Sequence, residues 1–166
     1  MHLVYYILPR FSSLFTAELS LIVSDCRGPY WKFDNLSHAI CNAHILRELK
    51  GIHENDTKES WAEDMRPLLR EMIHVRHEAE RAGASALPSE TVQAFQARYD
   101  AILEQAAGKN PLPVRQPGQR GKFRKGKVRC LIDCLTAHWD EALLFLADFR
   151  VPSPIAAPNK ASAWRK

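Results

Sequence analysis

The sequence lacks any apolar run long enough to cross a membrane. Residues 1–15 are apolar in places, but Pro9 and Arg10 interrupt them before about 20 residues, the length that a membrane-spanning helix needs. The segment also lacks the basic start of a secretory signal peptide. We therefore expect no membrane partner, no anchor and no targeting signal, and we predict a cytoplasmic protein.

Cysteine is sparse as well, with four residues in a chain of 166. Disulfide frameworks belong to small secreted domains, and no signal peptide indicates secretion here. We therefore expect all four cysteines to be reduced thiols. Cys130 and Cys134 lie one helical turn apart, and we expect both in the core.

Acidic residues are absent between Lys109 and Arg129. Residues 108–127 are rich in glycine, proline and basic residues, which predicts a loop. Its basic side chains can neutralise phosphates, which makes this segment the candidate nucleic-acid-binding site; the alternative is an ordinary solvated linker. The candidate residues are Arg115, Arg120, Lys122, Arg124, Lys125, Lys127 and Arg129.

A single strand is predicted at about residues 20–24, where the apolar run Leu21-Ile22-Val23 ends on Ser24 and Asp25. Asp25 would thus lie at the carboxyl end of a strand, where open α/β sheets usually present their chemistry. The alternative is an ordinary turn aspartate. Since one strand cannot form a sheet, we expect unpaired strand edges that promote aggregation.

The rest of the chain reads as helices, because apolar residues recur at helical spacing. Pro67 should bend or interrupt the second helix, since proline removes a backbone donor. The apolar faces predict a small bundle in a mainly α chain. The expected boundaries are Ser37, Thr57 and Ser89 as N-caps, Gly51 as a C-cap, and a last helix over about 127–148.

A zinc site is a second possibility, at His38, Cys41 and His44 in the first of these predicted helices. Imidazole and thiolate are usual zinc ligands, but a structural site needs four. Three positions that drift around a helix do not converge on one ion. We therefore favour a packed or capping helix face here, and solvated surface positions for His74 and His77.

Several motifs, in the same order, resemble the transposases of the insertion-sequence 66 family. The resemblance covers roughly residues 20–152, and it implies the helical insertion region of a ribonuclease-H-like α/β domain with only one or two strands retained. The motifs are Asp25 to Phe33, His38 to Leu49, Trp61-Ala62, Arg98-Tyr99-Asp100 with Ile102-Leu103, Asn110 to Pro113, Arg120-Gly121, Gly126 to Arg129, Phe145-Leu146, and Asp148-Phe149 with Val151-Pro152.

The resemblance implies DDE chemistry, in which three carboxylates hold two metal ions during phosphodiester displacement. Asp25 matches the second acid and would be a metal ligand in an intact site. Mg²⁺ and transposon-end DNA would serve the intact parent, in the bacterial cytoplasm, and an oligomer with an intact transposase is a further possible partner. We expect this fragment to hold no metal by itself.

The family's third acid should follow Val151-Pro152 in a pattern like V-P-F-x-N-N-x-A-E. Residues 153–166 do not follow it, but restoring one T after the Pro152 codon lets permitted codons read Phe, Asn, Ala-Glu and Ile-Arg-Met in order. We therefore predict an out-of-frame tail over 153–166. Residues 1–19 remain unassigned, with no segment matching the first acid, and 20–152 form the central fragment.

Three functional hypotheses follow. The first is a truncated, frameshifted remnant of a DDE transposase that lacks cut-and-join activity. The second is a small basic DNA-binding or regulatory helical protein that acts through the loop 108–127. The third is a structural helical module with no nucleic-acid role.

Overall fold

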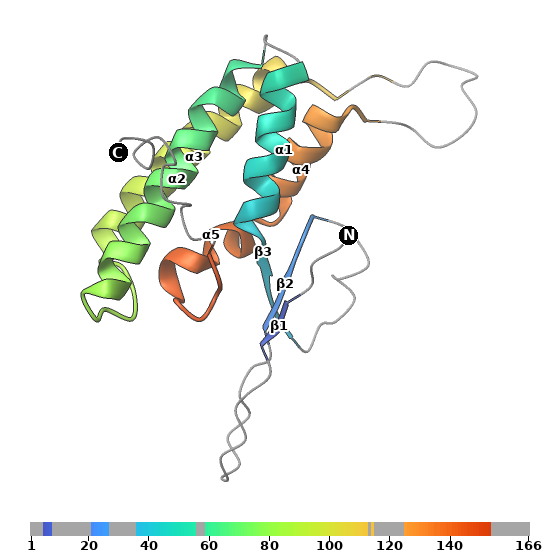
Figure 1. The fold of residues 1–166 in the computed structure, drawn as a ribbon. Coiled ribbons are helices and arrows are strands. Elements are labelled where there is room, and N and C mark those ends of the chain that lie inside the picture. The colour runs from blue at the N-terminus through green and yellow to red at the C-terminus, as the bar shows by residue number, and fades with distance from the viewer. Residues whose placement is uncertain are drawn as a thin grey trace, which may run out of the picture.

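The computed structural model describes residues 5–7, 21–26, 36–55, 59–112, 114 and 125–153, with the backbone alone for 5–7. Helices dominate, and three short strands lie together at one end of α1 (Figure 1). In chain order the elements are β1 (Tyr5–Ile7), β2 (Leu21–Ser24), β3 (Ser37–Ile40), α1 (Asn42–Asn55), α2 (Ser60–Arg81), α3 (Ser89–Lys109), α4 (Lys127–Ala137) and α5 (Trp139–Ala147). The prediction of a mainly α chain is confirmed.

The three strands form one sheet in the order β1-β2-β3. β1 runs antiparallel to β2, while β3 runs parallel to it, with Leu21 opposite Ser37 and Ser24 opposite Ile40. The predicted strand at 20–24 is present, but the expectation that it lacks partners is wrong. β2 is paired on both sides, and α5 packs against β3.

The first helix begins later than predicted. Ser37 is not an N-cap, because Ser37–Ile40 is strand β3, whose backbone hydrogen bonds go to β2. The carbonyl of Cys41 accepts the first helical bonds, from the N–H of His44 at 2.9 Å and of Ile45 at 3.2 Å. Gly51 lies inside α1 and does not end it.

α2 and α3 form an antiparallel hairpin (Figure 1). α2 continues through Pro67, which is exposed, so the proline does not interrupt the helix; whether it bends the helix stays a prediction. Gly83 ends α2 with a φ of 85°, a conformation that favours glycine. The N–H groups of Gly83 and Ala84 bond back to the carbonyls of Glu80 and Ala79, which satisfies the last turn of the helix.

The last predicted helix is two helices. α4 ends at Ala137, and α5 starts at Trp139 after a break at His138. The His138 N–H bonds to the Cys134 carbonyl at 2.9 Å, and its own carbonyl accepts from Ala142, so hydrogen bonding continues through the break. The changed direction lets α5 reach β3 while α4 stays against α1 and α3.

The core is continuous from the sheet to the hairpin. Every helix contributes one apolar face, and the largest fully buried side chains include Trp61, Tyr99 and Phe145. Within the described ranges, none of the helices is long and apolar enough to cross a membrane.

Candidate functional site

A cavity of about 460 Å³ lies where β2 and β3 end. Asp25 lines it from the end of β2, Arg47 and Glu48 from α1, and Lys125 and Lys127 from the start of α4. We call this space the Asp25 cavity; Cys26 and Cys130 also line it. Elements distant in sequence thus bring charges of both signs to one edge of the sheet.

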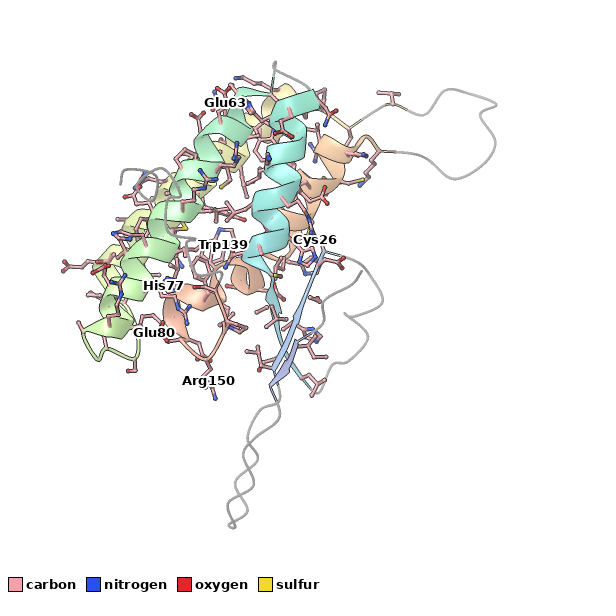
Figure 2. The ribbon with its side chains drawn as sticks, viewed as in Figure 1. Cys26, Glu63, His77, Glu80, Trp139 and Arg150 are labelled. Carbon is pink, nitrogen blue, oxygen red and sulfur yellow. A yellow bond between two sulfur atoms is a disulfide. The ribbon has the colours of Figure 1, made fainter. Side chains whose placement is uncertain are left out.

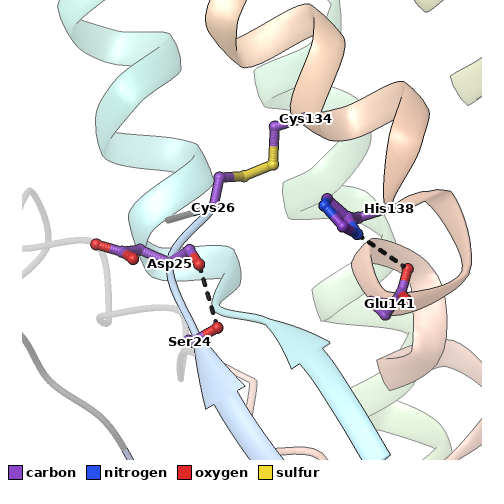
Figure 3. Close-up of a disulfide and its surroundings, with 6 residues drawn as sticks. All are labelled: Ser24, Asp25, Cys26, Cys134, His138 and Glu141. Atoms are coloured by element: carbon purple, nitrogen blue, oxygen red, sulfur yellow. Dashed lines mark hydrogen bonds and ion pairs between the residues drawn. A yellow bond between two sulfur atoms is a disulfide. The ribbon is translucent and has the colours of Figure 1, made fainter. Parts of the chain in front are cut away.

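Asp25 is held at this edge by its neighbours in the sheet. Because β2 and β3 are parallel, both carboxyl ends lie at the same edge, and the Cys41 N–H donates to the Ser24 carbonyl at 2.8 Å. Ser24 is buried, and its hydroxyl donates to the backbone carbonyl of Asp25 at 3.1 Å. The Asp25 side chain is half-buried and extends away from the disulfide beside it (Figure 3). The backbone of Asp25 is therefore fixed while its carboxylate reaches the cavity.

The basic residues at the start of α4 have unequal surroundings. Lys125 Nζ and Arg129 Nε donate to Asp133 at 2.6 and 2.8 Å. The hydrogen bond from Lys125, aided by Arg129, holds the pKa of Asp133 below its usual value. Lys125 and Arg129 are therefore paired with an acidic residue, Asp133, which follows the basic segment in the sequence. Lys127, by contrast, is exposed and lines the cavity.

The cysteines differ from the prediction. Cys26 and Cys134 form a disulfide with a Cα–Cα distance of 6.0 Å, which joins the end of β2 to α4 (Figure 3). Cys41 is a half-buried free thiol. Cys130 is also free, but it is exposed and not in the core. The prediction of four reduced thiols is wrong because folding brings together two residues separated by 108 positions.

The possible zinc ligands do not share a helix. His38 lies in β3, Cys41 precedes α1, and His44 lies in its first turn. Within the part of the chain that the structure describes, no group of three or more His, Cys, Asp or Glu side chains is arranged to hold a metal ion. The zinc hypothesis placed all three residues on one helix, and the structure does not.

Comparison with known protein families connects this geometry to a function class. Residues 11–154 match the family described as Transposase IS66 family. The chain belongs to the IS66 transposase family. No curated protein and no solved structure matches the chain. The match includes residues 11–19, which the sequence motifs left unassigned, and it ends just beyond Val151-Pro152.

In this IS66 family member, the motif Arg98-Tyr99-Asp100 ties three helices together. Arg98 makes two hydrogen bonds to Glu71 of α2, at 2.7 and 2.9 Å. Tyr99 is fully buried, and Asp100 accepts a hydrogen bond from Trp139 Nε1 of α5 at 2.6 Å. The motif therefore has a structural role in the hairpin.

Asn110 has a comparable role beside the basic segment. Its amide donates to Glu59 Oε2 at 2.9 Å, which also accepts from Trp61 Nε1 at 2.7 Å. Its carbonyl accepts from Arg129 Nη1 at 2.7 Å. Asn110 thus links the start of α2, the end of α3 and the start of α4, and so fixes where Lys125 and Lys127 lie.

A third tie fixes the chain after α5. Arg76 is 3% exposed; its guanidinium donates to the Phe149 carbonyl at 2.6 Å and lies 5.0 Å from the centroid of that ring. Arg76 also donates to Ser153 Oγ, which forms a 2.8 Å hydrogen bond with His77 Nε2. His77, on α2, lies near this segment (Figure 2). His77 is therefore half-buried, whereas His74 is exposed.

The predicted site residues are only partly brought together. Asp25, Lys125 and Lys127 share the cavity, while Arg129 bonds to Asp133 and Asn110. Four others lie outside the described residues: Arg115, Arg120, Lys122 and Arg124. Arg47 and Glu48 were missed as site residues, although their charges beside the apolar positions of α1 marked the helix face that does not enter the core.

Proposed function

We propose that this chain engages DNA at the Asp25 cavity, and that Asp25 descends from the second acid of a DDE transposase site. One observation carries the proposal: Asp25 directly follows a strand of a parallel pair, in a family-matched segment, in a cavity that also holds cations. Carboxyl ends of parallel strands are the usual place for such chemistry. If Asp25 were an ordinary turn aspartate, there would be no reason for it to line a cavity together with basic side chains.

The cations of the cavity favour a polyanionic ligand. Arg47 and Lys127 are exposed, on elements that meet beside Asp25. Arginine and lysine bind backbone phosphates without reading the base sequence, and binding releases counterions, so affinity falls as salt rises. Arg115, Arg120, Lys122 and Arg124, which lie outside the described residues, stay predicted nucleic-acid-binding residues.

Mg²⁺ belongs to the intact parent in this proposal. Carboxylate oxygens are its preferred protein ligands, so Asp25 could contribute one of them. When bound, a metal pair activates the attacking oxygen and stabilises the leaving one. The described residues do not form a complete metal-binding group around Asp25. We therefore assign no catalytic step to this chain.

We further propose that the chain has no cut-and-join activity by itself. After Val151-Pro152 the residues do not follow the family's Glu motif, and a restored frame would return it. Sequencing the gene together with its flanking regions tests this. A third-acid motif in a neighbouring frame is expected. Mg²⁺-dependent cleavage of transposon ends by the purified chain, abolished in Asp25→Asn, would overturn the proposal of inactivity.

Fluorescence anisotropy with a labelled DNA duplex tests binding at the cavity. The double variant Arg47→Gln/Lys127→Gln removes two phosphate contacts, so the slope of log affinity against log salt should fall by about 1.8. Arg70→Gln/Arg81→Gln, which removes two exposed cations of α2 outside the cavity, is the matched control and should bind like the wild type. Equal losses in the cavity variant and the control would contradict the proposed site.

A second candidate function is DNA binding without chemistry, in which the chain competes with an intact transposase for its ends. Exposed cations at the cavity favour it, because binding needs no metal. Adding the chain to an active transposase should then slow transposition, while the Arg47→Gln/Lys127→Gln variant should not. Equal inhibition by both proteins would point instead to an oligomer with the intact enzyme.

A further inference from the structure

We propose that the Asp25 cavity is also a thiol–disulfide exchange site, in which the free thiol of Cys130 attacks the disulfide at Cys26. The disulfide partner of Cys26 would then alternate between Cys134 and Cys130. Both candidate partners lie on α4, so the exchange changes which turn of that helix is tied to the end of β2.

The cavity brings the attacking thiol and the disulfide together. Of the four cysteines, all of which the structure describes, Cys26 and Cys130 line the cavity, whereas Cys41 and Cys134 do not. Cys130 is exposed, and its Sγ lies 3.6 Å from the Lys125 carbonyl, a weak hydrogen bond that leaves the thiol easily displaced. Of the two disulfide-bonded cysteines, Cys26 is the one that shares a cavity with Cys130, so we propose it as the sulfur that is attacked.

The Cys26–Cys134 and Cys26–Cys130 disulfides would both join the end of β2 to the same face of α4. Cys130 and Cys134 are four residues apart in α4, which places them on one face about 6 Å apart along the axis. The existing disulfide spans 6.0 Å between Cα atoms. Joining Cys26 to Cys130 instead of Cys134 would therefore move the attachment point on α4 by about one helical turn.

The exchange consumes no oxidant and no reductant. Cys130 loses its proton to solvent, and the thiolate attacks Cys26 Sγ. A Cys26–Cys130 bond forms as the Cys26–Cys134 bond breaks, and Cys134 leaves as a thiolate that takes up a proton.

The exchange would act on the site next to it. Cys26 follows Asp25 directly, so a new link to Cys130 would draw the end of β2 towards Lys125 and Lys127. This consequence rests on the function proposed for Asp25. The exchange itself does not, because it depends only on the three cysteines and α4.

Peptide mapping of the full chain without reduction tests the exchange. Cleavage before aspartate separates the three cysteines, since Asp25 starts the Cys26 peptide and Asp133 separates Cys130 from Cys134. The chain is incubated with reduced and oxidised glutathione, then alkylated. We expect the Cys26 peptide linked to the 133–139 peptide in one population and to the 100–132 peptide in another. A Cys26 peptide that is never linked to the 100–132 peptide, whether or not Cys134 is alkylated, would overturn the proposal.

Two variants make the result sharper. Cys134→Ser, oxidised with glutathione disulfide, should shift the Cys26 linkage to Cys130, with two glutathione thiols released for each bond. Cys41→Ser is the matched control and should leave the distribution of the wild type. If Cys134→Ser does not fold, the wild-type Cys26 peptide linked to the 100–132 peptide decides the matter, because glutathione alone can also free Cys134. Neither assay measures DNA binding. If the chain proved not to bind DNA, the proposed thiol–disulfide exchange could therefore still be correct.

Discussion

The α2–α3 hairpin and the Asp25 cavity use charged residues in different ways. In the hairpin, Arg98 and Glu71 bond each other across two helices, and Asp100 bonds Trp139 of α5. At the cavity, Arg47 and Lys127 are exposed around a space. Polar groups that bond one another stabilise a fold, whereas charged groups that line a space are available to a ligand. The comparison distinguishes charged residues that bond one another from the charged residues that we propose to contact DNA.

The largest expected effect is on the hairpin. Trp61 is fully buried and donates to Glu59, so Trp61→Ala should lower the free energy of unfolding by about 3–5 kcal/mol. Denaturant unfolding followed by circular dichroism measures the change. Trp61→Phe keeps most of the apolar volume and should lose less. Equal losses in both variants would mean that the hydrogen bond, and not packing, holds this end of α2.

Reduction should have the next largest effect, and it acts at the cavity. Breaking the Cys26–Cys134 bond frees the end of β2 from α4, with an expected loss of about 2–4 kcal/mol. Thermal unfolding with and without dithiothreitol measures the loss, and a Cys26→Ser/Cys134→Ser variant should show no response to dithiothreitol. An unchanged transition in the reduced wild type would show that packing alone holds this corner.

Acid should weaken the contact between α2 and the segment after α5. Burial, together with the nearby Arg76 guanidinium, lowers the pKa of His77 from its ordinary 6.5. The unfolded chain therefore binds more protons near that pH, so this contribution is full above pH 6.5 and is lost as pH falls through the lowered value. The melting temperature should fall less steeply with acid in His77→Gln. Parallel curves for both proteins would contradict this assignment.

The smallest effect is expected at Tyr99. Its hydroxyl is buried without a hydrogen-bond partner among the described residues, and burial raises its pKa above the usual range. Tyr99→Phe removes this unsatisfied group and should change stability by less than about 0.5 kcal/mol, or raise it. Tyr99→Leu tests the ring instead and should destabilise. A loss above about 1 kcal/mol in Tyr99→Phe would reveal a partner for the hydroxyl.

The sequence predicted local features well where periodicity decided them. The apolar faces of α2 and α3 matched their helical spacing, as Met65, Met72 and Leu103 illustrate. Ser37–Ile40 was misassigned because a strand of four residues has no clear period, and its pairing with β2 depends on distant chain. The break at His138 was missed for a similar reason, since the apolar pattern continues through it.

The site was less predictable because it depends on tertiary contacts. Asp25 could be singled out from its strand and from the family motif, but its neighbours Arg47 and Glu48 come from a helix that packs beside it. The disulfide joins residues 108 positions apart, which no spacing rule identifies. The partner of Lys125 was missed because the acid-free segment stops just before Asp133.

Lysine acetylation in the presence and absence of a DNA duplex tests the central claim most directly, because it compares regions within one molecule. Lys127 lines the Asp25 cavity, while Lys50, also exposed, lies on α1 with Glu54 as its partner and does not line it. We expect DNA to protect Lys127 from acetylation and to leave Lys50 unchanged, as measured by mass spectrometry. Equal modification of Lys127 with and without bound DNA would contradict the assignment of the cavity as the DNA site.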